Sequence, residues 1–520
     1  MQSKSQSSLM KNFFRVTDKN RKWWILAAMT SSVSMIFVDV TVLPVTLPTI
    51  QRELNISDLG LQWIINAYLL TLSALVLAGG RLGDMFGHRR NFCWGLLLFS
   101  IASALCGLSL SGWWFIGSRA LQGVGAALLL PSSSALLLNA FPAHERGRAL
   151  GLYISVGSVF LVLGPLIGGI FTQYLSWRYV FWINLPIALI GLALTFFSVP
   201  KSEKIREAFD FLGFFTISLG ISAIVVSLMQ AERWGWTSPL TLGLLLAGIA
   251  CIVLLMLFDR DVETPFFDFK LFKNREFTSG LFCIFCNQFL VMVTVYWAIY
   301  FQTILGYSPA GSGSLALVAN LPVIIAAPLS GYLVDRLGAK IPVTVGFCSI
   351  AFSLLMLNWF ANTLRFELLV FSLITFGGGV SLIFTPSFAI ALRDMAAQKR
   401  GVASATITAI RQFSSTLGIA IMGALFLNLQ KDRFSYLLKQ DPDTLHLRPS
   451  KFDGLLAQAP DAIEALRKLS EGVAQKVQAA FEAAYVRAFE AVNMVGVVVA
   501  LIGLLFGLFF LKNRQKTHNQ

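Results

Sequence analysis

The first apolar stretch of the chain contains an acidic residue. The stretch begins at Trp23 and runs for roughly two dozen residues, a length that can cross a bilayer as a helix, and Asp39 is its only acid. A carboxylate at that depth is costly, so we expect it to face a cavity or a partner and to serve a purpose. Pro44 and Pro48 are expected to break the far end of this helix, where freed carbonyls would line water. The alternative is an acid at a helix end that reaches the membrane interface.

A basic residue in another apolar stretch is a candidate partner for Asp39. At 1.5 Å per residue, Asp39 lies roughly 21 Å along the first helix, and Arg119 lies at roughly 22 Å in the antiparallel fourth helix. Burial favours a protonated carboxyl and a nearby guanidinium favours the charged form, so a balanced pair could take up a proton or yield it to a bound cation. The alternative is a static charge pair that holds the two helices together.

Further polar residues lie inside other apolar stretches. Arg411 and Gln412 lie about nine residues into the thirteenth stretch, and no acid in the apolar stretches of the second half is an evident partner. We expect Arg411 to face a cavity and to meet a ligand, water or helix carbonyls. The other candidates for the cavity are Asn66, Asn287, Gln288, Asn320, Tyr296 and Tyr300. The amides could instead join helices, at about 1 kcal/mol each, and the tyrosines could hold a lipophilic cation or belong to an interfacial aromatic belt.

Two sequence patterns occur twice. Gly80-x-Leu82-x-Asp84-x-x-Gly87 recurs as Gly331-x-Leu333-x-Asp335-x-x-Gly338 at an offset of 251 residues, and Arg146-Gly147 recurs as Arg400-Gly401 at an offset of 254. Two anchors at nearly one offset predict a duplicated unit of six helices, with two inserted helices between the copies. The copies are expected to be related by an axis along the membrane normal.

Composition and charge identify the class of protein. The 520 residues are 56% hydrophobic and 13% charged, whereas about a quarter of a soluble protein is charged. This predicts an all-α polytopic membrane protein. The net charge of +14 does not indicate nucleic-acid binding, because 26 Lys and Arg residues fall in the tails and alternate loops and only 4 in the loops between them. That asymmetry predicts cytoplasmic termini and an even number of spans.

Fourteen apolar stretches are predicted to span the membrane, at 23–47, 61–80, 92–110, 113–138, 148–173, 178–198, 211–230, 237–258, 278–304, 312–334, 341–361, 366–391, 402–430 and 491–511. The predicted organisation is a cytoplasmic tail (1–22), a six-helix half (23–200), two inserted helices (201–277), a second six-helix half (278–511) and a cytoplasmic tail (512–520). The second half includes a long extracytoplasmic loop, 431–490. Its latter part is expected to be helical from Pro460-Asp461 and to extend the last span, either with a role in transport or as a solvated hairpin.

Cofactor and metal motifs are missing from the sequence. Cys283-x-x-Cys286 has no second pair or nearby His, so all six cysteines are expected to be buried thiols. The four histidines show no metal-ligand spacing. The sequence also lacks a Gly-x-x-x-x-Gly-Lys-[Ser/Thr] loop, the motif that would indicate direct use of ATP. We therefore expect no metal and no cofactor.

These motifs resemble the major facilitator superfamily. The stretch from Gly80 to Arg89-Arg90 resembles its motif A, and Arg119-x-x-Gln122 with the following Gly123 resembles motif B. The run Gly164-Pro165 with Gly168-Gly169 resembles motif C, the antiporter motif. The stretches 38–42 (VDVTV) and 177–186 (WRYVFWINLP) are similar to the 14-helix drug:proton antiporters of the EmrB/QacA type.

The resemblance implies a fold and a function. It implies a major facilitator fold of 6 + 2 + 6 helices and no enzyme activity: a bacterial inner-membrane antiporter that exports lipophilic, often cationic drugs against protons. Asp39, Arg119, Gln122 and Arg411 would couple protons to substrate, with both ligands competing for Asp39. We expect a monomer in the bilayer that binds small lipophilic substrates and no nucleic acid, and leave a periplasmic adaptor protein open. The alternatives are an exporter of one metabolite or siderophore, and a membrane-embedded enzyme or sensor.

The duplicated motif A predicts a pair of gate contacts. The resemblance implies that Asp84 docks on the helix N-terminus at 401–403, where free N–H groups attract a carboxylate, with Arg89 or Arg90 helping to hold it. By the repeat, Asp335 should meet the backbone of Gly147 and Arg148, more loosely because fewer basic residues follow it. The alternative is that Asp84 pairs with the arginines of its own loop.

Gly164 and Gly168 are four residues apart on one helix face, so another helix can approach closely. The resemblance implies that this run also seals the protein against proton leak. The alternative is that it serves helix packing alone.

Overall fold

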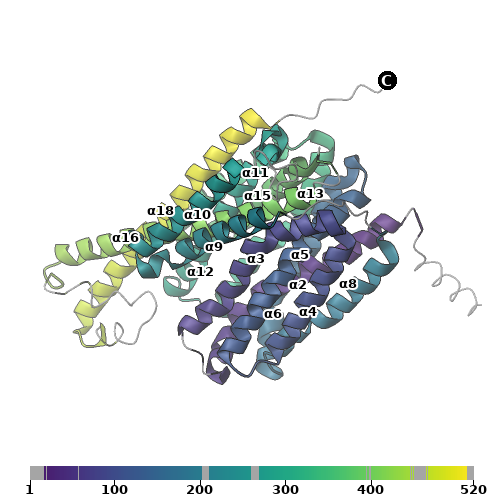
Figure 1. Cartoon of the computed structure of the whole chain (residues 1–520). Helices are drawn as coiled ribbons and strands as arrows, with labels where there is room; N and C mark the ends of the chain where they lie inside the picture. The colour runs from purple at the N-terminus through teal and green to yellow at the C-terminus, as the bar shows by residue number, and fades with distance from the viewer. Residues whose placement is uncertain are drawn as a thin grey trace, which may run out of the picture.

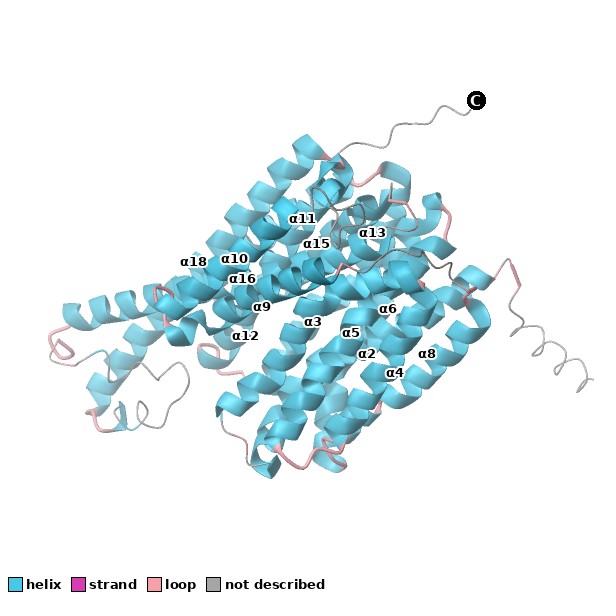
Figure 2. Cartoon of the chain, in the orientation of Figure 1, coloured by secondary structure: helices cyan, strands magenta, loops and turns pink. Residues whose placement is uncertain are grey.

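The regular structure of the described chain is helical (Figure 2). The computed structural model describes residues 17–18, 20–54, 56, 58–201, 210–258, 269–307, 309–393, 395–396, 400–445, 447, 449, 464 and 466–511. Within these ranges, fourteen helices are long and apolar enough to cross a membrane, as the hydropathy pattern predicts. The fold is therefore that of an all-α polytopic membrane protein.

The first half of the chain and the inserted pair contain nine α-helices in the described ranges. They are α2 (Arg21–Leu54), α3 (Asp58–Phe86), α4 (His88–Gly107), α5 (Gly112–Ala140), α6 (Arg146–Tyr174), α7 (Tyr179–Trp182), α8 (Asn184–Ser198), α9 (Phe211–Trp234) and α10 (Pro239–Phe258), with the 3-10 turn η1 (Ala143–Glu145) before α6 and the single-turn α7 leading into α8. The second half contains η2 (Phe269–Lys273), α11 (Arg275–Val291), α12 (Val293–Thr303), α13 (Pro309–Leu337), α14 (Lys340–Thr363), α15 (Phe366–Arg393), α16 (Arg400–Gln440) and α18 (Glu471–Phe510).

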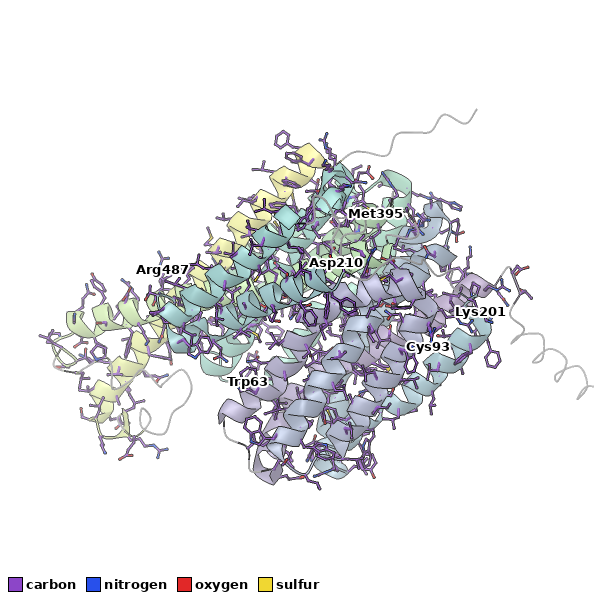
Figure 3. All side chains as sticks on the ribbon, in the orientation of Figure 1. Trp63, Cys93, Lys201, Asp210, Met395 and Arg487 are labelled. Carbon is purple, nitrogen blue, oxygen red and sulfur yellow. The ribbon has the colours of Figure 1, made fainter. Side chains whose placement is uncertain are left out.

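The two halves pack against each other through two helix pairs. α3 of the first half lies against α16 of the second, and α13 of the second lies against α6 of the first (Figure 1). The repeat relates these pairs to each other, since α3 and α13 carry the two copies of the Gly80 pattern. The inserted helix α9 packs on α10 and contacts both α3 and α16. We call the end of the bundle at which α18 ends, at Phe510, the termini side. Met395 and Lys201 lie toward this end and Trp63 toward the other (Figure 3).

The first helix is longer than predicted. α2 continues as helix through Pro44 and Pro48 to Leu54, so the expected break at these two prolines is wrong. Its extended end is held by Glu53, whose Oε2 accepts hydrogen bonds from Trp177 Nε1 (2.8 Å) and Arg178 Nη1 (2.9 Å). The Trp177 bond, with the Arg178 charge beside it, lowers the pKa of Glu53. Neighbouring segments can in this way stabilise a helix that contains proline.

Two predicted spans are interrupted. The ninth is divided at Met292 into α11 and α12, and the sixth is divided at Ile183 into α7 and α8. At Met292 the backbone hydrogen bonds join residues three apart: the Met292 N–H donates to Phe289 O (3.2 Å), and the Val295 N–H donates to Met292 O (3.2 Å). Neither residue is Gly or Pro, so apolar periodicity alone does not reveal the breaks.

Helices α16 and α18 project beyond the rest of the bundle on the side opposite the termini (Figure 1). The predicted extension of the last span is confirmed, because α18 begins at Glu471, but α16 also continues past residue 430 to Gln440. Phe434 of α16 packs edge-on against Phe481 of α18, with ring centroids 5.9 Å apart. The predicted helix start at Pro460-Asp461 lies outside the described residues. An apolar contact between the two helices thus explains why the extension is helical.

The charge asymmetry predicts the sidedness of this projection. In a variant without native cysteines, Leu445→Cys, which is 60% exposed at the projecting end, should react with a membrane-impermeant maleimide in intact cells. Ala396→Cys, an exposed position on the termini side, is the matched control and should react only after permeabilisation. The reverse pattern would show that the termini are extracytoplasmic.

Candidate functional site

Asp39 lies in a closed hydrogen-bond network between α2 and α5. Arg119 Nη1 donates to Asp39 Oδ2 at 2.6 Å, and Gln122 Nε2 donates to Asp39 Oδ1 at 2.7 Å. Arg119 Nη1 also donates to Gln122 Oε1 at 2.6 Å. The predicted pairing of Asp39 with Arg119 at matching depth is therefore confirmed, and both oxygens of the carboxylate have partners.

A second layer of residues holds this network in place. Arg119 Nε donates to the carbonyl oxygen of Ile64 (3.2 Å), and its guanidinium lies 4.5 Å from the ring centroid of Tyr68. Gln122 Nε2 also donates to Ser103 Oγ (2.9 Å), which accepts a bond from Asn184 Nδ2 (3.2 Å). Sequence reasoning assigned no role to these supporting residues. Asn184 belongs to the WRYVFWINLP stretch noted above, which was the available signal.

The network is sealed from the large cavity of the protein. Asp39 is 2% exposed and Arg119 is 1% exposed, and neither lines that cavity. Tyr68 stands between them, since its side chain lines the cavity and its ring covers Arg119. Asp39 thus faces partners, as expected for a buried acid. The expectation that it also meets substrate directly has no support in this arrangement.

The cavity lies between the two halves and has a volume of about 950 Å³. Ser134 of α5 and Ser404 of α16 line it and are hydrogen-bonded to each other across the halves. Its lining continues to Asn428 and Lys431, both exposed, where α16 enters the projecting hairpin. The cavity therefore opens away from the termini side, and its size is that of a site for small organic molecules.

Most of the predicted cavity residues line this space. Arg411 lies in its wall, where its Nε donates to Gln288 Oε1 at 3.3 Å and its guanidinium lies 4.5 Å from the Phe384 ring centroid. The other predicted residues found in the wall are Asn66, Asn287 and Asn320.

Tyr296 and Tyr300 were predicted to face the cavity, and this is wrong. Tyr296 stacks on Phe426 (5.5 Å between centroids) and donates its hydroxyl to Ile419 O (3.1 Å), while Tyr300 stacks on Phe489 (4.3 Å). The two tyrosines share a face of α12, but that face packs on α16 and α18 in the core of the second half. The break at Met292 separates α12 from the helix that lines the cavity.

The first gate contact forms as predicted. Val402 N–H, at the start of α16, donates to Asp84 Oδ2 at 3.0 Å. His88 accompanies Asp84, with its Nε2 2.9 Å from Asp84 Oδ1. Arg89 donates to the Phe196 carbonyl oxygen (3.1 Å), and Arg90 is exposed. The spacing of four residues between Asp84 and His88 was the overlooked signal.

The second gate contact repeats the first. Asp335 Oδ1 accepts a bond from Gly147 N–H (3.1 Å), and its Oδ2 accepts one from Arg148 N–H (2.9 Å), so this contact is no looser in its geometry. A Cβ on Gly331 would lie 2.1 Å from the Gly147 carbonyl oxygen, so glycine permits the approach of α13 to α6.

Glycines also shape the turns that follow the two gate helices. Gly80 is a buried residue of α3, one turn before Asp84. Gly87 (φ 93°) and Gly338 (φ 82°) adopt positive φ values at the turn after each gate helix. Residues with a side chain rarely adopt a positive φ, which explains why glycine occupies the same place in both copies.

Two arginines add an exchanged pair of contacts beside the gates. Arg146 Nη1 donates to the Arg393 carbonyl oxygen (3.2 Å), and Arg400 donates to Asn139 Oδ1. Both donors and both acceptors are related by the same offset of 254 residues, so the repeat is preserved in the contacts. Burial, with repulsion from Arg146, lowers the pKa of Arg400 to about 10. Together these contacts close the termini side of the cavity.

The Gly164 run packs α6 against α2 next to Asp39. A Cβ on Gly164 would lie 1.9 Å from Thr41 Oγ1, and one on Gly168 would lie 3.2 Å from Val42 Cγ1. A Cβ on Gly169 would meet no atom within 4 Å. The predicted close approach is confirmed for Gly164 and Gly168, and α6 continues as helix through Pro165.

Alanine substitution separates the two explanations of this run. Gly164→Ala should lower the free energy of unfolding by about 1–3 kcal/mol, because the added methyl group overpacks a close helix contact. Gly169→Ala, the matched control in open space, should change it little. Thermal unfolding of both purified variants measures this, and a pH-sensitive dye in liposomes measures proton leak. Leak through folded Gly164→Ala would support a seal, whereas lost stability without leak would support packing alone.

Comparison with known proteins identifies the family. A sequence profile of the Major Facilitator Superfamily matches residues 29–211 and 205–419. The chain belongs to the major facilitator superfamily. Among relatives in the family, Multidrug resistance protein Stp of Mycobacterium tuberculosis is 32% identical over 406 residues, which cover 77% of this chain and 75% of that protein. Puromycin resistance protein pur8 of Streptomyces alboniger is 31% identical over 419 residues (78% and 82%), and riboflavin transporter RibZ of Clostridioides difficile is 32% identical over 411 residues (78% and 88%).

Solved structures of the family share the fold. A double Trp mutant of XylE superposes with a TM-score of 0.62 over 95% of this chain and 97% of that one, at 15% identity. The human organic anion transporter MFSD10 superposes with a TM-score of 0.60 over 94% and 100%, at 12% identity. Both similarities concern the fold alone. The family is one of multi-pass membrane transporters and is not an enzyme class, so membership disfavours the embedded-enzyme alternative.

Proposed function

We propose that the protein exports lipophilic compounds across the bacterial cytoplasmic membrane in exchange for protons. The observation that carries this proposal is the Asp39–Arg119–Gln122 network, a buried titratable group whose arginine partner packs on Tyr68 in the wall of a large, mainly apolar cavity. Protons are the coupling ion and no other cofactor takes part. Both termini are cytoplasmic, so the observed state is open to the outside.

The helix α3 connects the proton site to the cavity and the gate. Ile64 and Tyr68 contact Arg119, Leu69 and Leu72 line the cavity, and Asp84 docks on α16. From Ile64 to Asp84 the helix covers about 30 Å at 1.5 Å per residue. A change in the position of α3 would therefore act on all three places.

Protonation of Asp39 is the event that moves α3 in this mechanism. A neutral carboxyl attracts Arg119 less strongly, so the guanidinium is freer to leave Asp39 while it remains bonded to Ile64 O and packed on Tyr68. Tyr68 then shifts in the cavity wall, and the cavity changes shape for its substrate. Proton binding and substrate binding are thus coupled indirectly, and the two ligands do not compete for the Asp39 carboxylate.

The relatives support the substrate class. Multidrug resistance protein Stp and puromycin resistance protein pur8 carry names that describe drug resistance, and each covers more than three quarters of this chain. We propose a monomer in the bilayer that binds lipophilic small molecules and no nucleic acid. A periplasmic adaptor that docks on the projecting α16–α18 hairpin is compatible with this proposal.

Transport by the purified protein in liposomes tests the function. A panel of labelled compounds that includes puromycin is loaded with and without an imposed pH gradient, and flux is compared with that of protein-free liposomes. Accumulation of several unrelated lipophilic compounds that collapses with the pH gradient is the expected result. Flux that is unaffected by collapse of the gradient would contradict proton coupling.

A dedicated exporter of one metabolite is the second candidate. The similarity to riboflavin transporter RibZ over 78% of this chain is the specific observation that favours it. The same panel, with riboflavin added, separates the two functions. Flux of one compound alone would support the dedicated exporter, and flux of several would support the multidrug function.

A further inference from the structure

The described charged side chains in the cavity wall are positive. They are Arg411, in the first third of α16, and Lys431, near the outer mouth. Among the side chains that the structure describes, no Asp or Glu lines the cavity. A cation inside the cavity would therefore meet like charge and no carboxylate.

Asp39 does not correct this imbalance. Its two oxygens already accept bonds from Arg119 and Gln122, and Tyr68 lies between this network and the cavity. The Asp39–Arg119 pair is neutral as a unit, so it contributes little net field at the cavity wall.

Arg411 is held without a carboxylate partner in the described part of the chain. Its Nε donates to the Gln288 side chain, and its guanidinium covers the ring of Phe384. A cation in a protein interior is costly unless an opposite charge accompanies it. Thr408 and Ser415, three and four residues away on α16, also line the cavity, and their hydroxyls donate to the carbonyl oxygens of Ser404 (3.0 Å) and Arg411 (3.1 Å).

The part of the cavity wall that the first half contributes is mainly apolar. The first half contributes Ile36, Phe37, Leu69, Leu72 and Ile154 to the cavity. A ligand that fills the space therefore meets the Arg411 guanidinium from the second half and a mainly apolar surface from the first half.

We propose that the cavity accepts amphipathic organic anions: molecules with an apolar body and one acidic head group, such as a carboxylate or sulfonate. The head group pairs with Arg411 beside Gln288, and the body packs on the apolar wall of the first half. This inference rests on the proposed export function and names its substrate class, in place of the cations expected from the family resemblance.

The charge of the substrate determines how transport responds to voltage. When one monoanion leaves and one proton enters, about two positive charges move inward per cycle, and an inside-negative potential drives both. The exchange of one monovalent cation for one proton moves no net charge. Anion export should therefore accelerate under a potassium–valinomycin potential at constant pH.

Binding of matched fluorescent probes tests the proposal without any need for transport. The probes are dansyl-undecanoic acid, its methyl ester and the corresponding primary amine, which share a body and differ in head-group charge. The full-length protein in lipid nanodiscs should bind the acid about 10- to 100-fold more tightly than the ester, as for a hydrogen bond to a charged group. Equal binding of acid and ester, or tighter binding of the amine, would overturn the proposal.

Variants assign the preference to Arg411. Arg411→Gln should remove the preference for the acid while it retains ester binding, and Arg411→Lys should keep most of it. Arg433→Gln is the matched control, because it removes a positive charge from the same helix at an exposed position outside the cavity. Ester binding shows that Arg411→Gln is folded, so an unchanged acid preference in that variant would contradict the assignment.

The outcomes distinguish this inference from the proposed function. Preference for the acid without pH-driven flux would retain the anion site and reject the proton-coupled exporter. Proton-driven flux of cations by a protein that does not prefer the acid would retain the exporter and reject the anion site.

Discussion

Asp39→Asn is expected to abolish proton-driven export. The amide keeps the shape of the carboxyl group but cannot titrate, so a proton can no longer change the attraction for Arg119. Substrate-induced proton release from the purified protein, followed with a pH-sensitive dye, should fall to the level of protein-free buffer. Exchange of substrate down its own gradient should continue. A variant that still concentrates substrate against a gradient would show that Asp39 is not the coupling group.

The structure adds a control that separates coupling from folding. Removal of one charge of a buried pair leaves the other uncompensated, at a cost of about 3–5 kcal/mol. Arg119 retains its bonds to Ile64 O and Gln122 Oε1, which reduce this cost. The double variant Asp39→Asn, Arg119→Gln should recover thermal stability and still lack proton release. Recovery of proton release in the double variant would assign coupling elsewhere.

Simultaneous loss of both gate contacts is expected to shift the protein toward the state that is open on the termini side. Each carboxylate at a helix N-terminus contributes about 0.3–2 kcal/mol, so Asp84→Asn with Asp335→Asn should change the equilibrium by several-fold to over a hundredfold. Export should slow, and substrate should still bind. Accessibility of Ser404→Cys at the cavity floor to a thiol reagent, added from the termini side of proteoliposomes, measures the shift. Asp443→Asn, on the surface of the projecting hairpin, is the matched control.

A disulfide tests the first contact directly. Asp84→Cys with Val402→Cys should crosslink under mild oxidation in the state described here, because the Asp84 carboxylate contacts the Val402 amide. The crosslink should stop export, and reduction should restore it. Absence of a crosslink in every state, with normal export by Asp84→Asn, would contradict the gate assignment.

The number and position of the spans could be predicted because hydropathy and loop charge are local properties. Fourteen membrane-length helices follow from runs of apolar residues. The family resemblance implied the first gate contact, and the repeat of the Gly80 pattern then predicted the second. Asp39 and Arg119 were identified as partners because each residue of a helix adds a known rise, so depth can be counted along the chain. A charge inside an apolar run is also rare, so it stands out in the sequence.

The tertiary structure decided which way the side chains face. Tyr296 and Tyr300 have the spacing of a ligand face, but the break at Met292 turns that face onto Phe426 and Phe489 in the core. Protons and substrate were expected to compete for Asp39, yet Tyr68 covers its partner Arg119, and Arg411 is the charged residue that lines the wall near Gln288. Depth follows from residue number, whereas orientation around a helix in a membrane depends on neighbours that are distant in sequence. Apolar side chains occupy both the lipid-facing and the buried sides of these helices, so periodicity alone could not assign the face that lines the cavity.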